Sequence, residues 1–251
     1  LHFFSPAQVM KLLEVVVGQH TQADVLATGF AFARRLGKTA VRAGVCEGFI
    51  GNRLLNACRT AADHMVLDGA CPFRIDAALT AFGLAMGPFE MSDLAGLDIA
   101  WAMRKRRAAM RDQQERVAGF ADRLCEAGHF GRKAGRGYYV YPQDGGTRQE
   151  SPEALAFIAA ERAGRGIVPR NFSEAEIVSR YLCAMVNEGA RVVQEGIALR
   201  PGDVDVVLLL GYGFPRHRGG PMKWADMTGL GDVLARIEAY AAADPFFWQP
   251  A

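Results

Sequence analysis

The chain has 251 residues, of which 50% are hydrophobic and 22% are charged, and its formal net charge is +2. This is the composition of an ordinary globular protein, with enough residues for two or three small cores. The near-balanced charge does not favour nucleic-acid binding, and no apolar run reaches the roughly 18 residues that a membrane-spanning helix needs.

The first 45 residues predict a strand, a helix and a second strand. Residues 10–17 are rich in leucine and valine, as expected of a buried strand, and residues 22–36 repeat apolar side chains at a helical period. Residues 39–45 predict a short strand. Such a unit needs a larger sheet to join, yet no G-x-G-x-x-G fingerprint of a dinucleotide-binding domain follows any strand in the chain.

From Gly48 onward the pattern is helical. Glycines and prolines divide it into predicted helices over 52–67, 75–82 and 98–126, the last being one long helix or a pair. Residues 131–141 predict a glycine-turned hairpin or loop with aromatic side chains, and 143–149 predict a polar loop.

The second half repeats the first. Residues 180–205 parallel 52–76, with an arginine near the helix start, a glycine stop and then an aspartate. GPFEMSDLAGL (87–97) also aligns without gaps with GPMKWADMTGL (220–230). A capping box, Ser173 to Glu176, starts the second copy. We therefore expect two copies of one helical module, which pack on each other, at 46–141 and 173–251, joined by a polar linker over 142–172.

Three polar residues in the first copy and its flanking strand are candidates for proton transfer: His2, Glu14 and Asn52. Imidazole can take up and return a proton near neutral pH, a buried carboxylate can hold the ring, and an amide can orient an oxygen. The alternative is structural: His2 caps a strand, Glu14 is exposed and Asn52 caps a helix. Spacing alone favours this alternative.

Five scattered cysteines lack C-x-x-C spacing, and the histidines do not cluster with cysteines or carboxylates. Neither a metal site nor a disulfide framework is expected, and reduced thiols fit a cytoplasmic protein.

Four segments resemble the L-3-hydroxyacyl-CoA dehydrogenase family: HFFSPAQVMKLLEVV, VCEGFIGNRLL, GPFEMSDLAGLD and GRKAGRGYYVY. The resemblance runs nearly end to end. It implies that His2 is the catalytic histidine, Glu14 its carboxylate partner and Asn52 the active-site asparagine. It also implies NAD as cofactor and an acyl-CoA substrate. The family's cofactor-binding residues, and a serine that contacts the substrate hydroxyl, lie upstream of His2.

The implied fold is mostly α: the end of a Rossmann-like NAD-binding domain (1–45), followed by the two helical modules of the family's C-terminal domain. The second copy has Ser179 in place of Asn52 and no preceding histidine–glutamate strand, which indicates a structural partner rather than a second active site. Its sequence most resembles multifunctional β-oxidation enzymes, which carry an enoyl-CoA hydratase domain and can associate with a thiolase. Because the chain opens at Leu1, inside a motif, we expect a fragment that is inactive alone.

Other interpretations stay open at this stage. The chain could be a non-catalytic helical scaffold from a decayed dehydrogenase, or part of an enzyme acting on free hydroxy acids. Basic residues at Lys11, 104–107, 131–136 and 216–218 could contact CoA phosphates, although exposed helix faces and loops look the same.

Overall fold

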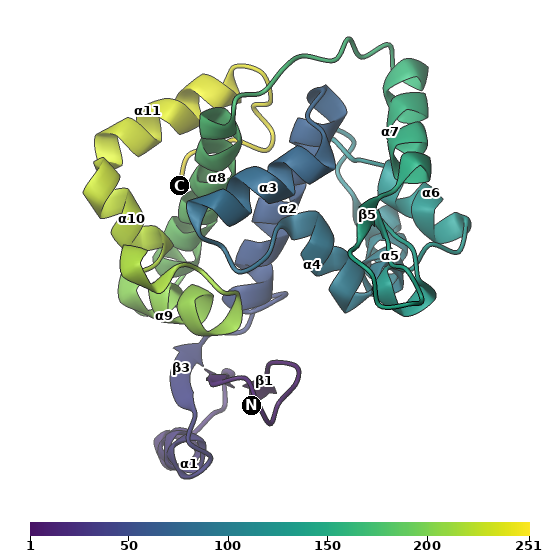
Figure 1. Cartoon of the computed structure of the whole chain (residues 1–251). Coiled ribbons are helices and arrows are strands. Elements are labelled where there is room, and N and C mark those ends of the chain that lie inside the picture. Colours follow the sequence, from purple (N-terminus) through teal and green to yellow (C-terminus); the bar gives the residue numbers. More distant parts are fainter. The chain divides into compact units, whose positions relative to one another are not determined.

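The computed structural model describes residues 1–251, and most of the chain is helical (Figure 1). The chain divides into two compact units. Unit 1 comprises residues 1–58, 83–85 and 182–251, and unit 2 comprises residues 59–82 and 86–181. Two long helices, α2 (Gly51–Asp68) and α8 (Glu174–Gln194), each begin in one unit and end in the other.

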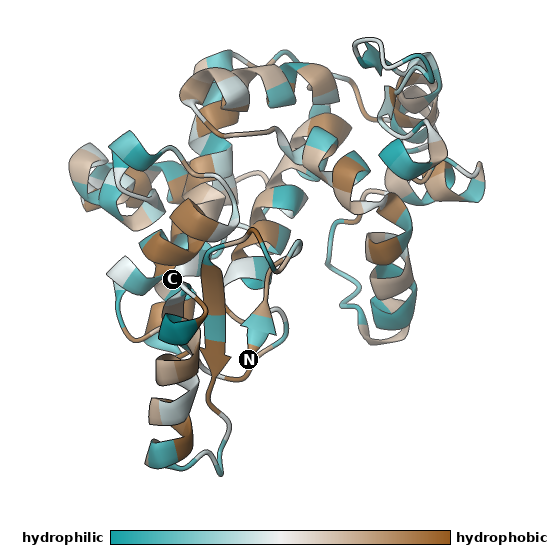
Figure 2. Cartoon of the chain, turned by 60° about the horizontal axis from the view of Figure 1, so that its bottom comes forward, coloured by the Kyte–Doolittle hydropathy of each residue, from teal (hydrophilic) through white to brown (hydrophobic).

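Unit 1 begins with a three-stranded sheet of order β1-β2-β3. Strand β1 (His2–Phe3) is antiparallel to β2 (Leu12–Val16), and β2 is parallel to β3 (Thr39–Ala43), with α1 (Ala23–Arg35) connecting the parallel pair. This confirms the predicted strand, helix and strand. Most of β2 is fully buried, and Figure 2 shows an almost wholly hydrophobic strand in this part of the chain. The apolar run of β2 therefore supplies the centre of the sheet.

The rest of unit 1 is helical. It contains α9 (Pro201–Gly211), the 3₁₀ turn η3 (Arg216–Arg218), α10 (Pro221–Thr228) and α11 (Leu230–Ala241), together with the first turns of α2 and the end of α8. Val204, Val207 and Leu208 of α9 are buried, and so are Val233 and Ile237 of α11.

Unit 2 contains the helices α3 (Pro72–Phe82), α4 (Pro88–Ala95), α5 (Leu97–Arg107), α6 (Phe120–Glu126) and α7 (Pro152–Gly164). Short pieces connect them: the 3₁₀ turns η1 (Ala108–Met110) and η2 (Arg132–Ala134), and the strands β4 (Tyr139–Val140) and β5 (Gln149–Glu150). Its core includes Phe89 and Phe120, whose rings pack edge-on against Tyr138 at centroid distances of 4.8 and 6.3 Å. These large rings exclude water from the middle of the unit.

The predicted helix or pair over 98–126 is a pair, since α5 ends at Arg107 and α6 begins at Phe120, after a polar stretch that ends in Gly119. One helix was not predicted: α7 lies inside the segment assigned to a polar linker. Its start has a clear local cause, since the Ser151 hydroxyl accepts a hydrogen bond from the Ala154 amide and Pro152 occupies the first helical position.

The two aligned glycine–proline pairs each begin a helix that is capped by a distant aspartate. Asp76 accepts hydrogen bonds from the amides of Phe89 and Glu90 at 3.0 and 2.9 Å, and from the Tyr139 hydroxyl at 2.8 Å. Asp205 accepts from the amide of Met222 at 2.7 Å. In both cases a carboxylate satisfies amides that the first turn of a helix leaves without partners.

The two glycines allow these caps to form. A Cβ atom on Gly87 would lie 2.2 Å from Asp76 Oδ1, and one on Gly220 would lie 2.3 Å from Asp205 Oδ1. Any side chain at either position would push the carboxylate away from the helix start.

We predict that the two caps differ in their contribution to stability. Asp76 is only 2% exposed, so Asp76→Ala leaves buried amides unpaired and should lower the free energy of unfolding by about 2–4 kcal/mol. Asp205 is partly exposed, so Asp205→Ala should cost about 1 kcal/mol, because water can replace the carboxylate. Urea unfolding of both variants measures the difference; equal losses would contradict this account of burial.

Candidate active site

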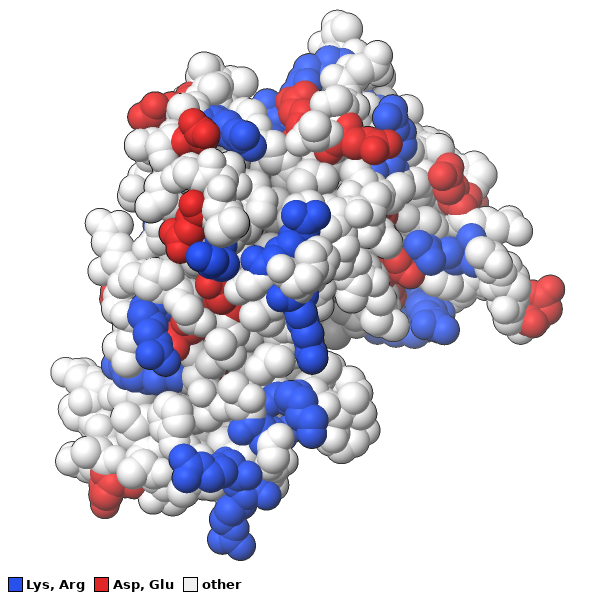
Figure 3. Space-filling model, turned by 60° about the vertical axis from the view of Figure 1, so that its left-hand side comes forward, with Lys and Arg blue, Asp and Glu red and all other residues white.

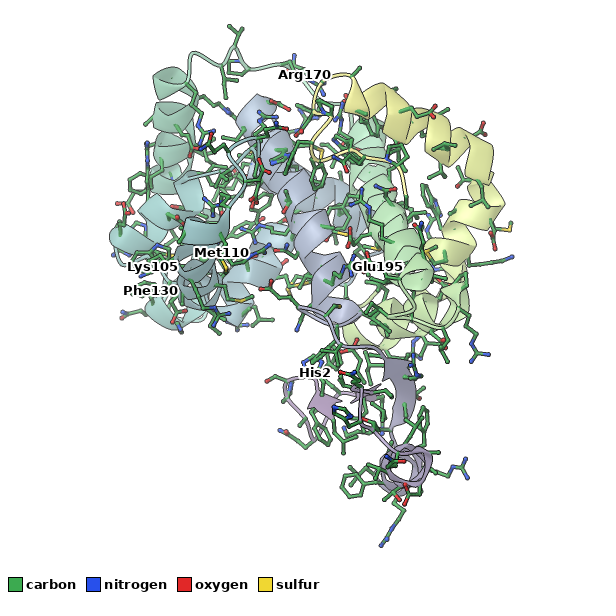
Figure 4. All side chains as sticks on the ribbon, turned by 180° about the vertical axis from the view of Figure 1, so that it is seen from behind. His2, Lys105, Met110, Phe130, Arg170 and Glu195 are labelled. Carbon is green, nitrogen blue, oxygen red and sulfur yellow. The ribbon has the colours of Figure 1, made fainter.

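His2 and Glu14 lie opposite each other on neighbouring strands. The antiparallel register of β1 and β2 pairs His2 with Glu14, which places both side chains on the same face of the sheet. His2 Nδ1 lies 2.6 Å from Glu14 Oε2. The Glu14 side chain is fully buried, whereas that of His2 is 27% exposed. The carboxylate therefore holds one ring nitrogen, and part of the imidazole surface stays accessible (His2 is labelled in Figure 4).

The second oxygen of Glu14 binds the start of α2. Oε1 accepts hydrogen bonds from the amides of Ile50 and Gly51 at 3.2 and 2.9 Å. The positive end of the helix dipole and these unpaired amides favour an anion at this position. The interpretation of Glu14 as an exposed strand residue is therefore wrong, because its side chain is fully buried. Three hydrogen-bonding partners compensate the cost of burying its charge.

Aromatic rings enclose His2. Its ring centroid lies 4.8 Å from that of Phe4 and 5.3 Å from that of Phe49, a residue whose φ of 51° is in the left-handed region. Phe3 does not contribute to this enclosure, since it is exposed and its ring lies beneath Lys38. The reason is the alternation of side chains along a strand, which turns Phe3 away from the face that carries His2. The apolar surroundings strengthen the histidine–carboxylate interaction.

Asn52 lies in the first turn of α2, directly after Gly51. Its Oδ1 accepts a hydrogen bond of 2.7 Å from the hydroxyl of Tyr212, the residue that ends α9. The Tyr212 ring packs edge-on against Phe4 at 5.7 Å. Burial, with a smaller contribution from the charge of Glu14, raises the pKa of Tyr212, so its hydroxyl stays protonated.

The structure thus places the three predicted residues within unit 1. His2 and Glu14 are in direct contact. Asn52 has no hydrogen bond to His2; it is linked to the pair through the turn that Glu14 caps.

The sequence reasoning missed two residues of this site, Phe49 and Tyr212. The sequence patterns assigned no role to either residue. No periodicity connects Tyr212 with Asn52, which is 160 residues away in sequence. The only signal available in the sequence was that each of these aromatic residues stands next to a glycine near a helix end.

Arg53 fixes the first turn of α2 to the end of α8 in unit 1. Its guanidinium forms hydrogen bonds with Glu188 at 2.5 Å and with both carboxylate oxygens of Glu195 at 2.6 and 2.8 Å. Glu195, labelled in Figure 4, directly follows α8. These carboxylates, Glu195 first, raise the pKa of Arg53. Bidentate pairing of this kind restricts the geometry of the turn that carries Asn52.

Several residues of the basic clusters are engaged with their own neighbours. In unit 2, Arg104 pairs with Asp122 and Lys133 with Asp98, both at 2.6 Å, while Lys105 lies over the Trp101 ring. Figure 3 shows acidic and basic side chains interspersed on one face of the molecule. Contact with CoA phosphates stays a prediction.

Three further structural findings concern other site classes. No group of three or more histidine, cysteine or acidic side chains could hold a metal ion. None of the five cysteines forms a disulfide bond. No helix is both long enough and apolar enough to cross a membrane.

Comparison with known protein families gives two matches that together cover most of the chain. Residues 48–141 and 177–249 match the family model of the 3-hydroxyacyl-CoA dehydrogenase C-terminal domain, and residues 1–46 match that of the 3-hydroxyacyl-CoA dehydrogenase NAD binding domain. The chain belongs to the 3-hydroxyacyl-CoA dehydrogenase family. This confirms the resemblance inferred from the sequence motifs.

Curated relatives include the peroxisomal bifunctional enzymes of Danio rerio and Homo sapiens, which are 44% and 40% identical over 98% and 97% of this chain. A peroxisomal fatty acid beta-oxidation multifunctional protein of Arabidopsis thaliana is 34% identical over 99%. The chain covers 36%, 35% and 35% of these three relatives, about a third of their length.

Among solved structures, the dehydrogenase part of multifunctional enzyme 1 from C. elegans is 27% identical, with a TM-score of 0.75 over 100% of this chain and 57% of that one. A 3-hydroxybutyryl-CoA dehydrogenase from Escherichia coli shares the fold, with a TM-score of 0.78 at 22% identity, over 100% of this chain and 68% of that one.

The predicted cytoplasmic localisation is wrong. The curated relatives from fish, mammals and plants are named peroxisomal or glyoxysomal proteins. The error has a simple cause: free cysteines indicate that disulfides are absent, but they do not identify a compartment.

NAD is the cofactor of the matched domain, and the residues of this chain do not include the element that binds its phosphates. Residues 1–46 contain no glycine-rich loop at a helix start, which is the element that binds a dinucleotide's phosphates. The buried carboxylate and the partly exposed imidazole suit the transfer of a proton. The chain therefore supplies groups for acid–base chemistry and lacks a phosphate-binding loop.

We predict that Glu14→Gln reduces stability although the side chain keeps its size. The amide can still accept from one helix-start amide, but it removes the charge that His2 and the helix dipole both favour, so the free energy of unfolding should fall by about 1–3 kcal/mol. Glu238→Gln, an exposed carboxylate on α11, serves as the matched control and should change it by less than about 0.5 kcal/mol. Equal losses in urea unfolding would show that Glu14 does not hold the helix start.

Proposed function

We propose that the whole protein containing this chain is an NAD-dependent L-3-hydroxyacyl-CoA dehydrogenase, which oxidises 3-hydroxyacyl-CoA to 3-oxoacyl-CoA in fatty-acid β-oxidation. The observation that carries the proposal is the hydrogen bond between His2 and Glu14, anchored on the start of α2. Family membership and the named relatives support the reaction class. By the same relatives we propose a multifunctional enzyme that also hydrates enoyl-CoA and is located in peroxisomes.

In this proposal His2 is the catalytic base. Glu14 occupies Nδ1, so Nε2 is the nitrogen that accepts the proton of the 3-hydroxyl as C3 gives up its hydride. Glu14 compensates the charge that develops on the imidazole. Asn52 donates a hydrogen bond to the reacting oxygen. When bound, NAD supplies the hydride acceptor, and in the reverse direction His2 returns the proton.

We also propose the domain organisation that the sequence predicted: the end of a Rossmann-like domain at 1–45, helical modules at 46–141 and 173–251, and a linker at 142–172. The matching aspartate caps at Asp76 and Asp205 support a duplicated module. The Arg53 ion pairs with Glu188 and Glu195 support packing between the first helices of the two copies. Such packing would replace a partner chain. A thiolase complex stays a prediction.

A non-catalytic scaffold is the main alternative. A scaffold needs the helices but has no use for a partly exposed imidazole paired with a fully buried carboxylate. Burial of an unneeded carboxylate is costly unless partners compensate it, and here three partners do so at one position beside an accessible ring. This geometry favours an enzyme.

The test is NADH-dependent reduction by the whole protein, with acetoacetyl-CoA and free acetoacetate compared. We expect turnover of the thioester and little turnover of the free acid, and no appreciable turnover by the 251-residue chain alone, because it lacks the phosphate-binding loop. His2→Ala should lower kcat by about 100-fold or more, since general base catalysis is lost. His20→Ala, which removes an exposed histidine, is the control and should leave kcat unchanged.

Each outcome separates the alternatives. Absence of turnover by the folded whole protein would favour the scaffold. Equal rates on the thioester and the free acid would point to a different hydroxy-acid dehydrogenase. A near-normal kcat in His2→Ala would remove His2 from its proposed role.

A further inference from the structure

Tyr212 lies at the candidate site although it comes from the second half of the chain. It ends α9, where its amide donates to the Leu208 carbonyl, and its hydroxyl reaches Asn52 in the first turn of α2. Both residues belong to unit 1. No role for Tyr212 follows from the proton transfer between His2 and the substrate, so its contact with Asn52 requires a separate explanation.

The position of the Tyr212 ring is tightly defined. Phe4, which also contacts the His2 ring, packs edge-on against it. A Cβ atom on Gly51 would lie 2.7 Å from Tyr212 Cε2 and 2.9 Å from its hydroxyl oxygen, so only glycine leaves room for the ring. The amide of the same Gly51 donates to Glu14. The ring therefore packs on the turn that joins Glu14 to Asn52.

The hydrogen bond itself indicates which way the Asn52 amide faces. It joins the Tyr212 hydroxyl to Oδ1 of Asn52 at 2.7 Å, and an amide oxygen accepts hydrogen bonds but cannot donate them. Tyr212 thus donates to Oδ1, and burial keeps its hydroxyl protonated by raising its pKa. With Oδ1 occupied, the two N–H donors of the amide face away from Tyr212.

We propose that Tyr212 is a positioning residue that fixes the Asn52 side chain with its NH₂ group directed at the reacting oxygen of the substrate. This inference rests on the proposed dehydrogenase function. It means that the second half of the chain completes the active site, rather than only stabilising the first helical module.

The chemistry explains why the orientation matters. During oxidation the 3-hydroxyl loses its proton and becomes a carbonyl oxygen, which accepts hydrogen bonds but cannot donate them. An amide that presents N–H groups stabilises this oxygen, whereas a flipped amide presents its own oxygen and repels it. Without Tyr212, both orientations become accessible and only one of them assists the reaction.

The test uses the whole protein with Tyr212→Phe, which keeps the ring packed on Phe4 and Gly51 and removes only the hydroxyl. Removing one oriented donor from such a site typically costs about 100-fold in kcat, and loss of its orientation should cost less, about 10-fold, with KM changed less than about twofold. Tyr240→Phe is the matched control, since Tyr240 packs on Trp248 in the same unit, and it should keep its kcat.

A double-mutant cycle gives the sharper result. If Tyr212 acts through Asn52, Asn52→Ala should lower kcat by about 100-fold, and adding Tyr212→Phe should lower it no further. Additive losses, a normal kcat in Tyr212→Phe, or an effect confined to KM would each overturn the proposal.

Asn52→Asp provides a test that does not depend on the folding of a Tyr212 variant. The carboxylate can still accept from Tyr212 but has no N–H to donate, so kcat should fall as far as in Asn52→Ala, and a retained kcat would overturn the inference. His2→Ala distinguishes a failure of this inference from a failure of the proposed function. If His2→Ala abolishes turnover while Tyr212→Phe has no effect, only this inference fails; if His2→Ala is fully active, the proposed function fails.

Discussion

The site depends on one carboxylate that is shared between a histidine and a helix. Glu14 uses one oxygen for the imidazole of His2 and the other for the amides that begin α2. Because its strand is buried, the carboxylate has no access to water and needs all of these partners. Movement of the α2 start would therefore disturb the histidine, and movement of the strand would disturb Asn52 in the first turn of the helix. A single buried anion thus sets the relative positions of the residues proposed to act on the substrate.

In the helical part of the chain, buried or partly buried carboxylates also bind the amides at the start of two other helices. A carboxylate from an earlier helix caps a glycine–proline start in both halves, through Asp76 and Asp205. The two halves nevertheless differ in the burial of another aligned aspartate. Asp93 of the first half is buried and accepts from the amides of Tyr138 and Tyr139, whereas the aligned Asp226 is exposed. The repeated sequence therefore keeps the aspartate cap in both halves, whereas the burial of the neighbouring aspartate differs. The second half contacts the site through Tyr212, which has no part in either cap.

Local patterns in the sequence predicted strands β2 and β3 and the helices α1, α2 and α3, because glycine stops and apolar periods act over a few residues. The helix α7 was missed although its serine and proline start was visible, since the surrounding polar composition suggested a linker. The pairing of His2 with Glu14 came from family resemblance, and the register of β1 and β2 supplies its physical basis. Tyr212 and Phe49 were not predictable, because their contacts depend on tertiary packing and on a left-handed backbone.

The protonation of the His2 ring tests the central claim most directly. If Glu14 holds Nδ1 as an ionised acceptor, the neutral ring must carry its proton on Nδ1 and leave Nε2 free to accept. Nitrogen-15 NMR of the histidine side chains, assigned by comparison with His2→Ala, distinguishes the two tautomers. We expect the Nδ1–H form, and Glu14→Gln should shift the ring toward the other form. A His2 ring that carries its proton on Nε2, or that exchanges freely between both forms, would contradict the account.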